Sequence, residues 1–305
     1  VINFFYLGER VMRKLIKIGI IIPFIFACLI TFLLPIYYTT YKPQGYGFEE
    51  YVDRVFVALG IDIFGSILFL ILFLSSYSGI KLFDEEKKKN AILSFSLFYF
   101  FMLMSAVSLT IGVVYLLVFK NSLTKVAILG FTWYPYPLSL GIATIFGVSA
   151  ACFLFIFGEN GYKPFIDKNK IIGILLFTIL IDIIAILPYN WYGVISPEEY
   201  IDIRFITNFL LLLIFLIAIY NTAFPIFGMI KDIESGIVRK RLKLIGYGLL
   251  LLIGFFIFYT LDALTGGGAP YTYWIVPAYI LIFIACLLIY LGYLTPAWLI
   301  NKLEK

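Results

Sequence analysis

Long apolar segments, separated by short polar connections, make up most of the chain. Each segment is apolar around its whole circumference for about 20 residues, the length that a helix needs to cross a hydrocarbon core of roughly 30 Å. A membrane β-barrel would instead show alternating polar and apolar residues. The pattern therefore predicts an all-α polytopic membrane protein with eight transmembrane helices, at residues 18–38, 55–80, 91–118, 137–157, 171–191, 205–230, 244–263 and 275–300.

Composition and charge agree with a membrane protein and predict its orientation. With 63% hydrophobic and 13% charged residues, the chain lacks the polar side chains that a soluble domain needs on its surface. Basic residues favour the cytoplasmic side, and 18 of the 23 lie in connections on one side of the predicted bundle. We expect a multi-pass protein of the cell membrane with both termini cytoplasmic, in contact with lipid and not with nucleic acid. The other five basic residues are Lys42, Arg54, Lys120, Lys125 and Arg204.

Two pairs of similar stretches indicate an internal duplication. LPIYYTTYKPQGYGFEEYVDR (34–54) resembles LPYNWYGVISPEEYIDIR (187–204), and AACFLFIFG (150–158) resembles IACLLIYLG (284–292). Four helices return the chain to its starting side, so the copies would be parallel repeats related by a pseudo-twofold axis along the membrane normal. We predict repeats at 1–168 and 169–305, with a cleft between them.

The first repeat contains extra residues at about 120–134, before the helix at 137–157. The apolar part of this insertion, VAILGF, is too short to cross a bilayer and ends among aromatic residues. It is predicted to be an interfacial or re-entrant segment, or else an extension of the following helix.

The residues that are absent exclude much chemistry. The chain has no histidine, so the usual haem, zinc and copper sites and the His-dependent hydrolase triads cannot be built. Cys28, Cys152 and Cys286 lie in apolar segments without a CxxC pair, which disfavours disulfide exchange. We expect no enzyme activity, no cofactor and no metal site.

Three carboxylates lie inside the predicted spans: Asp62, Asp182 and Asp262. A carboxylate in hydrocarbon is costly unless it is paired, protonated or hydrated. These residues are therefore candidates for binding an ion or solute, together with Asn208 and Asn221 in the sixth predicted helix. Small and polar residues share the helix faces of Asp62 and Asp182, which predicts that both acids face the protein interior. The alternatives are buried polar contacts between helices and, for Asp262, a solvated helix end.

Two acidic clusters precede the second and sixth helices on the outer side. They could bind a divalent cation or a basic partner, or simply favour the positive end of a helix dipole. The clusters are Glu49, Glu50 and Asp53, and Glu198, Glu199 and Asp202.

A stripe of small residues repeats every fourth position in the fourth helix. Such a stripe allows close helix contact, and it predicts a tight seam either within the chain or with another subunit of a homo-oligomer or larger complex. The residues are Ser139, Ala143, Gly147 and Ala151.

The duplication and the buried acids together favour a small permease that binds a cation, a proton or a cationic solute near Asp62 and Asp182. The alternatives are a membrane anchor or scaffold subunit, and a receptor-like sensor without an output domain. The composition, with a single glutamine and abundant Ile, Phe, Tyr and Lys, also suggests a thermophilic prokaryotic source.

Overall fold

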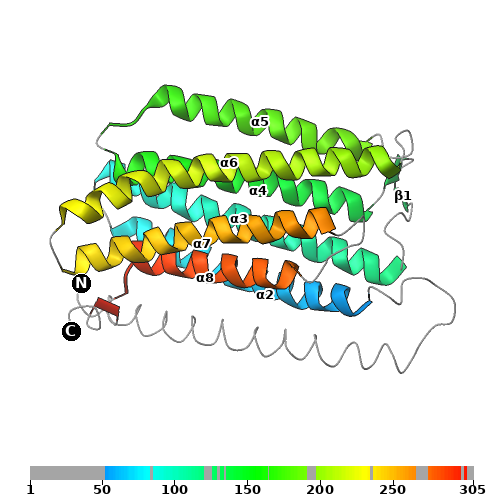
Figure 1. Cartoon of the computed structure of the whole chain (residues 1–305), viewed down its shortest axis with the longest axis horizontal. Helices are drawn as coiled ribbons and strands as arrows, with labels where there is room; N and C mark the ends of the chain where they lie inside the picture. Colours follow the sequence, from blue (N-terminus) through cyan, green and yellow to red (C-terminus); the bar gives the residue numbers. More distant parts are fainter. Residues whose placement is uncertain are drawn as a thin grey trace.

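The structure is a bundle of long helices that lie roughly side by side (Figure 1). It is a computed structural model, and the residues that it describes are 52–82, 85–119, 126–128, 131–133, 135–163, 165–190, 197–233, 236–265, 274–296 and 299–300.

Seven long α-helices run up and down in sequence order through the described residues (Figure 1). Judged on their described residues, six of them, α2, α3, α4, α6, α7 and α8, are long and apolar enough to cross a membrane, so the fold is that of a multi-pass helical membrane protein. The helices are α2 (Val52–Gly79), α3 (Glu86–Phe119), α4 (Pro135–Tyr162), α5 (Lys168–Asn190), α6 (Pro197–Asp232), α7 (Ile237–Thr265) and α8 (Ile275–Tyr293), and a 3-10 turn, η1 (Ile80–Leu82), follows α2.

Each of these helices coincides with a predicted apolar segment, although the boundaries differ. The predicted first helix, 18–38, lies outside the described residues. Helices α3 and α6 begin earlier than predicted because their charged first turns remain helical beyond the apolar run. Helix α8 ends at Tyr293 and not at residue 300, because Pro296 disfavours helical backbone at the residue before it.

The insertion before α4 contains a small β-hairpin. Strands β1 (Val126–Ile128) and β2 (Phe131–Trp133) pair antiparallel, with Ala127 opposite Thr132. Helix α4 begins only at Pro135, so the insertion does not extend this helix.

Neighbouring helices in the sequence pack together, and two further contacts join distant segments. Helix α4 packs against α6, and α2 packs against α8, while α5 lies at the edge of the bundle against α4 and α6 (Figure 1). Helices α3, α5 and α7 begin at the end of the bundle where α2, α4, α6 and α8 finish. We call this the basic end, because the lysines and arginines whose side chains the structure describes lie there.

Glycines permit the closest helix contacts. A Cβ atom added at Gly158 of α4 would lie 2.5 Å from Thr222 Oγ1 and 3.0 Å from Thr222 Cα in α6. The Thr222 hydroxyl is 3.1 Å from the Leu154 carbonyl oxygen and 2.9 Å from that of Ala218, and it can donate to either. This contact brings the backbones of α4 and α6 together near the basic end.

We predict that Gly158→Ala destabilises the protein by about 1–3 kcal/mol, because the new methyl group forces α4 and α6 apart. Gly173→Ala in α5 is the matched control, since a Cβ atom there would meet no atom within 4 Å. Thermal unfolding in detergent should show a lower Tm for the first variant only. Equal Tm values would contradict a tight contact at Gly158.

Candidate functional site

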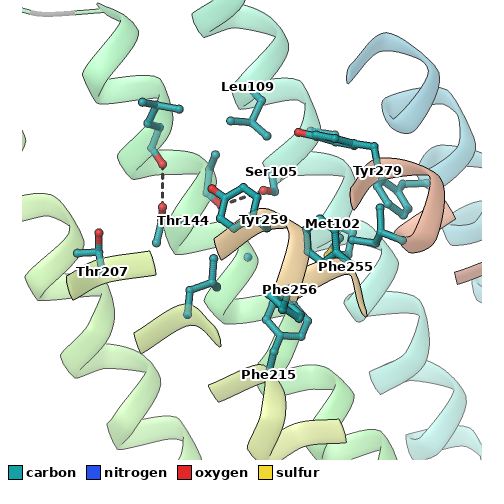
Figure 2. A pocket seen from close by; sticks show the side chains of 17 residues that line it. Met102, Ser105, Leu109, Thr144, Thr207, Phe215, Phe255, Phe256, Tyr259 and Tyr279 are labelled. Carbon is teal, nitrogen blue, oxygen red and sulfur yellow. Dashed lines mark hydrogen bonds between the residues drawn. The ribbon is translucent and has the colours of Figure 1, made fainter. Parts of the chain in front are cut away.

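A cavity lies among six helices, in the half of the bundle away from the basic end (Figure 2). Its volume is about 70 Å³. Its lining side chains come from α2, α3 and α4 in the first half of the chain and from α6, α7 and α8 in the second half. The cavity therefore lies where the first and second halves of the chain meet.

Two hydroxyl groups on the cavity wall already use their hydrogen atoms. Ser105 Oγ donates to the carbonyl oxygen of Ala143 over 2.9 Å, and Thr144 Oγ1 donates to that of Leu140 over 2.9 Å (Figure 2). Their remaining lone pairs can only accept hydrogen bonds. These two wall groups therefore suit a ligand that brings its own N–H or O–H donors, or a positive charge.

Aromatic side chains form much of the remaining wall (Figure 2). The ring centroids of Phe215 and Phe256 are 4.4 Å apart, and those of Phe255 and Phe256 are 4.7 Å apart. Phe255 also lies 5.7 Å from Tyr259 and 6.5 Å from Tyr279. This connected group of rings gives the cavity an apolar wall whose π-faces can attract a cation.

Asp62 of α2 does not line the cavity but lies near Tyr279, which does. Its side chain is completely buried, and neither carboxyl oxygen has a partner within hydrogen-bond geometry among the described residues. The hydroxyl of Tyr279, which lines the cavity, is the polar group that approaches this carboxyl, although not at full hydrogen-bond geometry. The predicted inward orientation of Asp62 is confirmed, and Tyr279 lies between the acid and the cavity.

Asp182 lies on a different part of the bundle. Its side chain is half-buried on α5, near Cys152 of α4, and its Oδ1 atom has no hydrogen-bond partner in the described part of the chain. Helix α5 packs against α4 and α6, whereas α2 packs against α3 and α8. The structure therefore does not bring Asp182 and Asp62 into one site.

Asn221 belongs to a third location, at the basic end. Its Oδ1 atom accepts a hydrogen bond from Lys163, and its Nδ2 atom donates to the carbonyl oxygen of Phe155 over 3.2 Å. The ammonium group of Lys163 also forms an ion pair with the fully buried Glu159. We call Glu159, Lys163 and Asn221 the polar cluster. The polar cluster joins α4, and Lys163 directly after α4, to α6.

Sequence reasoning missed Glu159 and Lys163. Both follow the predicted end of the fourth helix at residue 157, in a polar stretch typical of a solvated loop. The structure extends α4 to Tyr162, which carries Glu159 into the helix interface. Its spacing of four residues from Lys163 was the available signal, because residues at i and i+4 are neighbours on a helix.

The polar cluster borders an open cleft of about 560 Å³. Asp167 lies next to Glu159, whose Oε2 atom accepts a hydrogen bond from the Asp167 backbone N–H over 3.4 Å. The Oδ1 atom of Asp167 accepts hydrogen bonds from the backbone N–H groups of Asn169 (3.1 Å) and Lys170 (3.3 Å) and so caps α5. The N–H of Lys170 and the nearby ammonium group of the same residue lower the pKa of Asp167. Two carboxylates and three lysines thus line this cleft.

The small-residue stripe of α4 is buried within the chain itself. Ser139 and Ala143 are 5% exposed and Ala151 is fully buried, and a Cβ atom at Gly147 would lie 3.3 Å from Leu211 of α6. The predicted tight seam is therefore internal, and the stripe offers no surface to a second subunit.

The remaining predicted site residues cannot be tested by contacts. Glu49 and Glu50 lie outside the described residues. Six others lie on described helices, but their side chains do not belong to the described part: Asp53 on α2, Glu198, Glu199, Asp202 and Asn208 on α6, and Asp262 on α7. Among the described residues, no three His, Cys, Asp or Glu side chains are arranged to hold a metal ion.

The chain matches no protein-family model, and it has no significant similarity to a curated protein or to a solved structure. Its function therefore has to be inferred from the chemistry of its own residues.

We predict that Lys163→Met destabilises the protein by about 3–5 kcal/mol, because it leaves the Glu159 carboxylate buried without its cation. Lys170→Met is the control: this lysine pairs with Asp167 over 3.2 Å at an exposed site, and its loss should leave the Tm unchanged. The double variant Glu159→Gln, Lys163→Met should recover much of the loss in thermal unfolding. If the single and double variants unfold at the same temperature, Glu159 and Lys163 are not energetically coupled.

Proposed function

We propose that the chain is a small permease that binds a cation, a proton or a cationic solute between two parallel four-helix repeats, at residues 1–168 and 169–305. The observation that carries this proposal is the cavity where the two halves meet, with acceptor hydroxyls on its wall and, near Tyr279, the Asp62 carboxyl group, which has no hydrogen-bond partner among the described residues. In the proposed cycle, the two halves rock against each other around this site.

The helix contacts support two related halves. In the proposed duplication, each helix corresponds to the helix four places away in the other copy, so α4 corresponds to α8 and α2 to α6. A pseudo-twofold axis would therefore exchange the α4–α6 contact with the α2–α8 contact. Both contacts occur. The sequence alignment also pairs Asp62 with Leu211, 149 residues later. Leu211 packs on α4 at Gly147, and Asp62 lies near Tyr279 of α8, as the proposed exchange requires.

The different chemistry of the two ends supports alternating access. At the basic end, the polar cluster and the Gly158–Thr222 contact hold α4 against α6. Toward the other end, a cavity lies between the two halves, which remain in contact at Gly147 and Leu211. A binding cavity that is closed toward one end by a tight helix contact has the arrangement that a carrier needs before it opens to the other side.

The site favours positive charge. A carboxylate buried in a membrane protein is stabilised by a bound cation or by a proton. Among the described residues, no cationic side chain is hydrogen-bonded to Asp62. Eight membrane spans with both termini in the cytoplasm would make the cavity end the outer side, so that solute would enter from outside. Asp182, remote from α2, is not assigned to this site.

The test is cation flux into proteoliposomes. We predict that wild-type protein carries rubidium or methylammonium inward, or exchanges either for protons, as followed with isotope and an internal pH dye. Asp62→Asn should reduce the flux at least tenfold, because it removes the carboxyl group that can bind a proton or pair with a cation at the site. Glu85→Gln, at an exposed residue paired with Lys88 over 2.7 Å, should transport like wild type.

Wild-type vesicles that pass neither cation nor protons above the empty-vesicle rate would contradict the permease proposal and favour an anchor or sensor. Thermal unfolding of Asp62→Asn serves as the folding control, since a loss of flux is informative only if the variant remains folded.

A further inference from the structure

The cavity wall combines few hydrogen-bond acceptors with many aromatic rings, and this combination limits the chemistry of its ligand. Ser105 and Thr144 can only accept hydrogen bonds, because each already donates to a carbonyl oxygen of α4. A ligand with only acceptor groups, such as a ketone or an anion, would lose its hydration without gaining a partner at either hydroxyl. A ligand with N–H donors can satisfy both hydroxyls, and Thr207, Tyr259 and Tyr279 add further hydroxyl groups to the wall.

A bare inorganic cation fits this wall poorly. Calcium requires six to eight oxygen ligands and magnesium nearly ideal octahedral coordination. The wall is instead mainly phenyl and aliphatic, and among the residues described there is no cluster of three metal-ligating side chains. The desolvation of a divalent ion would not be offset here.

An organic ammonium ion matches both parts of the wall. Its N–H groups can donate to Ser105 and Thr144, its charge is attracted by the ring faces of residues such as Phe256 and Tyr259, and its alkyl group can replace water against apolar side chains. The buried Asp62 carboxyl group, which Tyr279 of the cavity wall approaches, is an acidic group close to the cavity. The cavity of about 70 Å³ limits the alkyl group to a few carbon atoms.

We propose that the cavity binds a small alkylammonium ion, with its ammonium group toward the hydroxyls of Ser105 and Thr144 and its alkyl group against the aromatic wall. This inference rests on the proposed cation permease and names the class of its solute.

The test is calorimetric titration of the purified full chain with n-propylammonium, n-propanol, rubidium and magnesium as separate probes. We expect saturable binding of n-propylammonium only, since n-propanol has nearly the same shape but no charge. Ser105→Ala should weaken this binding about tenfold or more, the loss typical of one hydrogen bond to a charged group. Asp62→Asn should weaken it as well.

Ser108→Ala is the matched control. Ser108 lies on the same helix and donates to the carbonyl oxygen of Met104 over 2.8 Å, but it does not line the cavity. This variant should bind n-propylammonium like wild type, which separates loss of a ligand contact from a general effect on α3.

The outcomes distinguish the two proposals. If n-propanol binds as tightly as n-propylammonium, or if Ser105→Ala and Ser108→Ala behave alike, the alkylammonium site is overturned. If rubidium binds and crosses the membrane but n-propylammonium does not bind, this inference fails while the permease proposal stands. If n-propylammonium binds but no cation crosses, the site stands and the transport proposal fails.

Discussion

The structure depends on how α4 and α6 meet inside a low-dielectric interior. A carboxylate buried there is costly unless it is protonated or has a cation and hydrogen bonds. Glu159 meets this requirement through Lys163, which is held in turn by Asn221 of α6. Gly158, one residue away, lets the two backbones approach at Thr222. Because charge pairing and close packing occur at the same place, the register of α4 against α6 is fixed near the basic end.

Away from the basic end, α4 and α6 remain in contact at Gly147 and Leu211 beside a cavity, and the buried acid nearby has no comparable partners among the described residues. Glu159 and Asp62 are both fully buried, yet within the described part of the chain only Glu159 has hydrogen-bond partners. A buried polar group left without partners is destabilising, and such groups are concentrated at functional sites. This difference between two carboxylates is the physical reason for locating solute binding next to Asp62 and for assigning a structural role to Glu159.

The sequence predicted the helices well because membrane spans are encoded locally, by runs of apolar residues. It also predicted that Asp62 faces inward, since Ala58 and Gly65 share its helix face. It could not predict which helices surround the cavity, because Phe256 and Leu211 resemble ordinary core residues. It grouped Asp62 with Asp182, since spacing along the chain reveals depth in the membrane but not position around the bundle. It overlooked Glu159, because a charged residue just beyond an apolar run resembles a loop residue.

The central claim is that a cavity at the meeting of the two halves can be reached from one side of the membrane only. It is tested most directly by replacing Cys28, Cys152 and Cys286 with alanine, introducing Ser105→Cys or Ser96→Cys, and applying a membrane-impermeant cationic thiol reagent to each side of sealed vesicles. Ser96 is fully buried in α3, nearer the basic end, and does not line the cavity. The account predicts that the cysteine at position 105 is labelled from the side opposite the basic end, and that the cysteine at position 96 is labelled from neither side. Equal protection of both cysteines from both sides would contradict it.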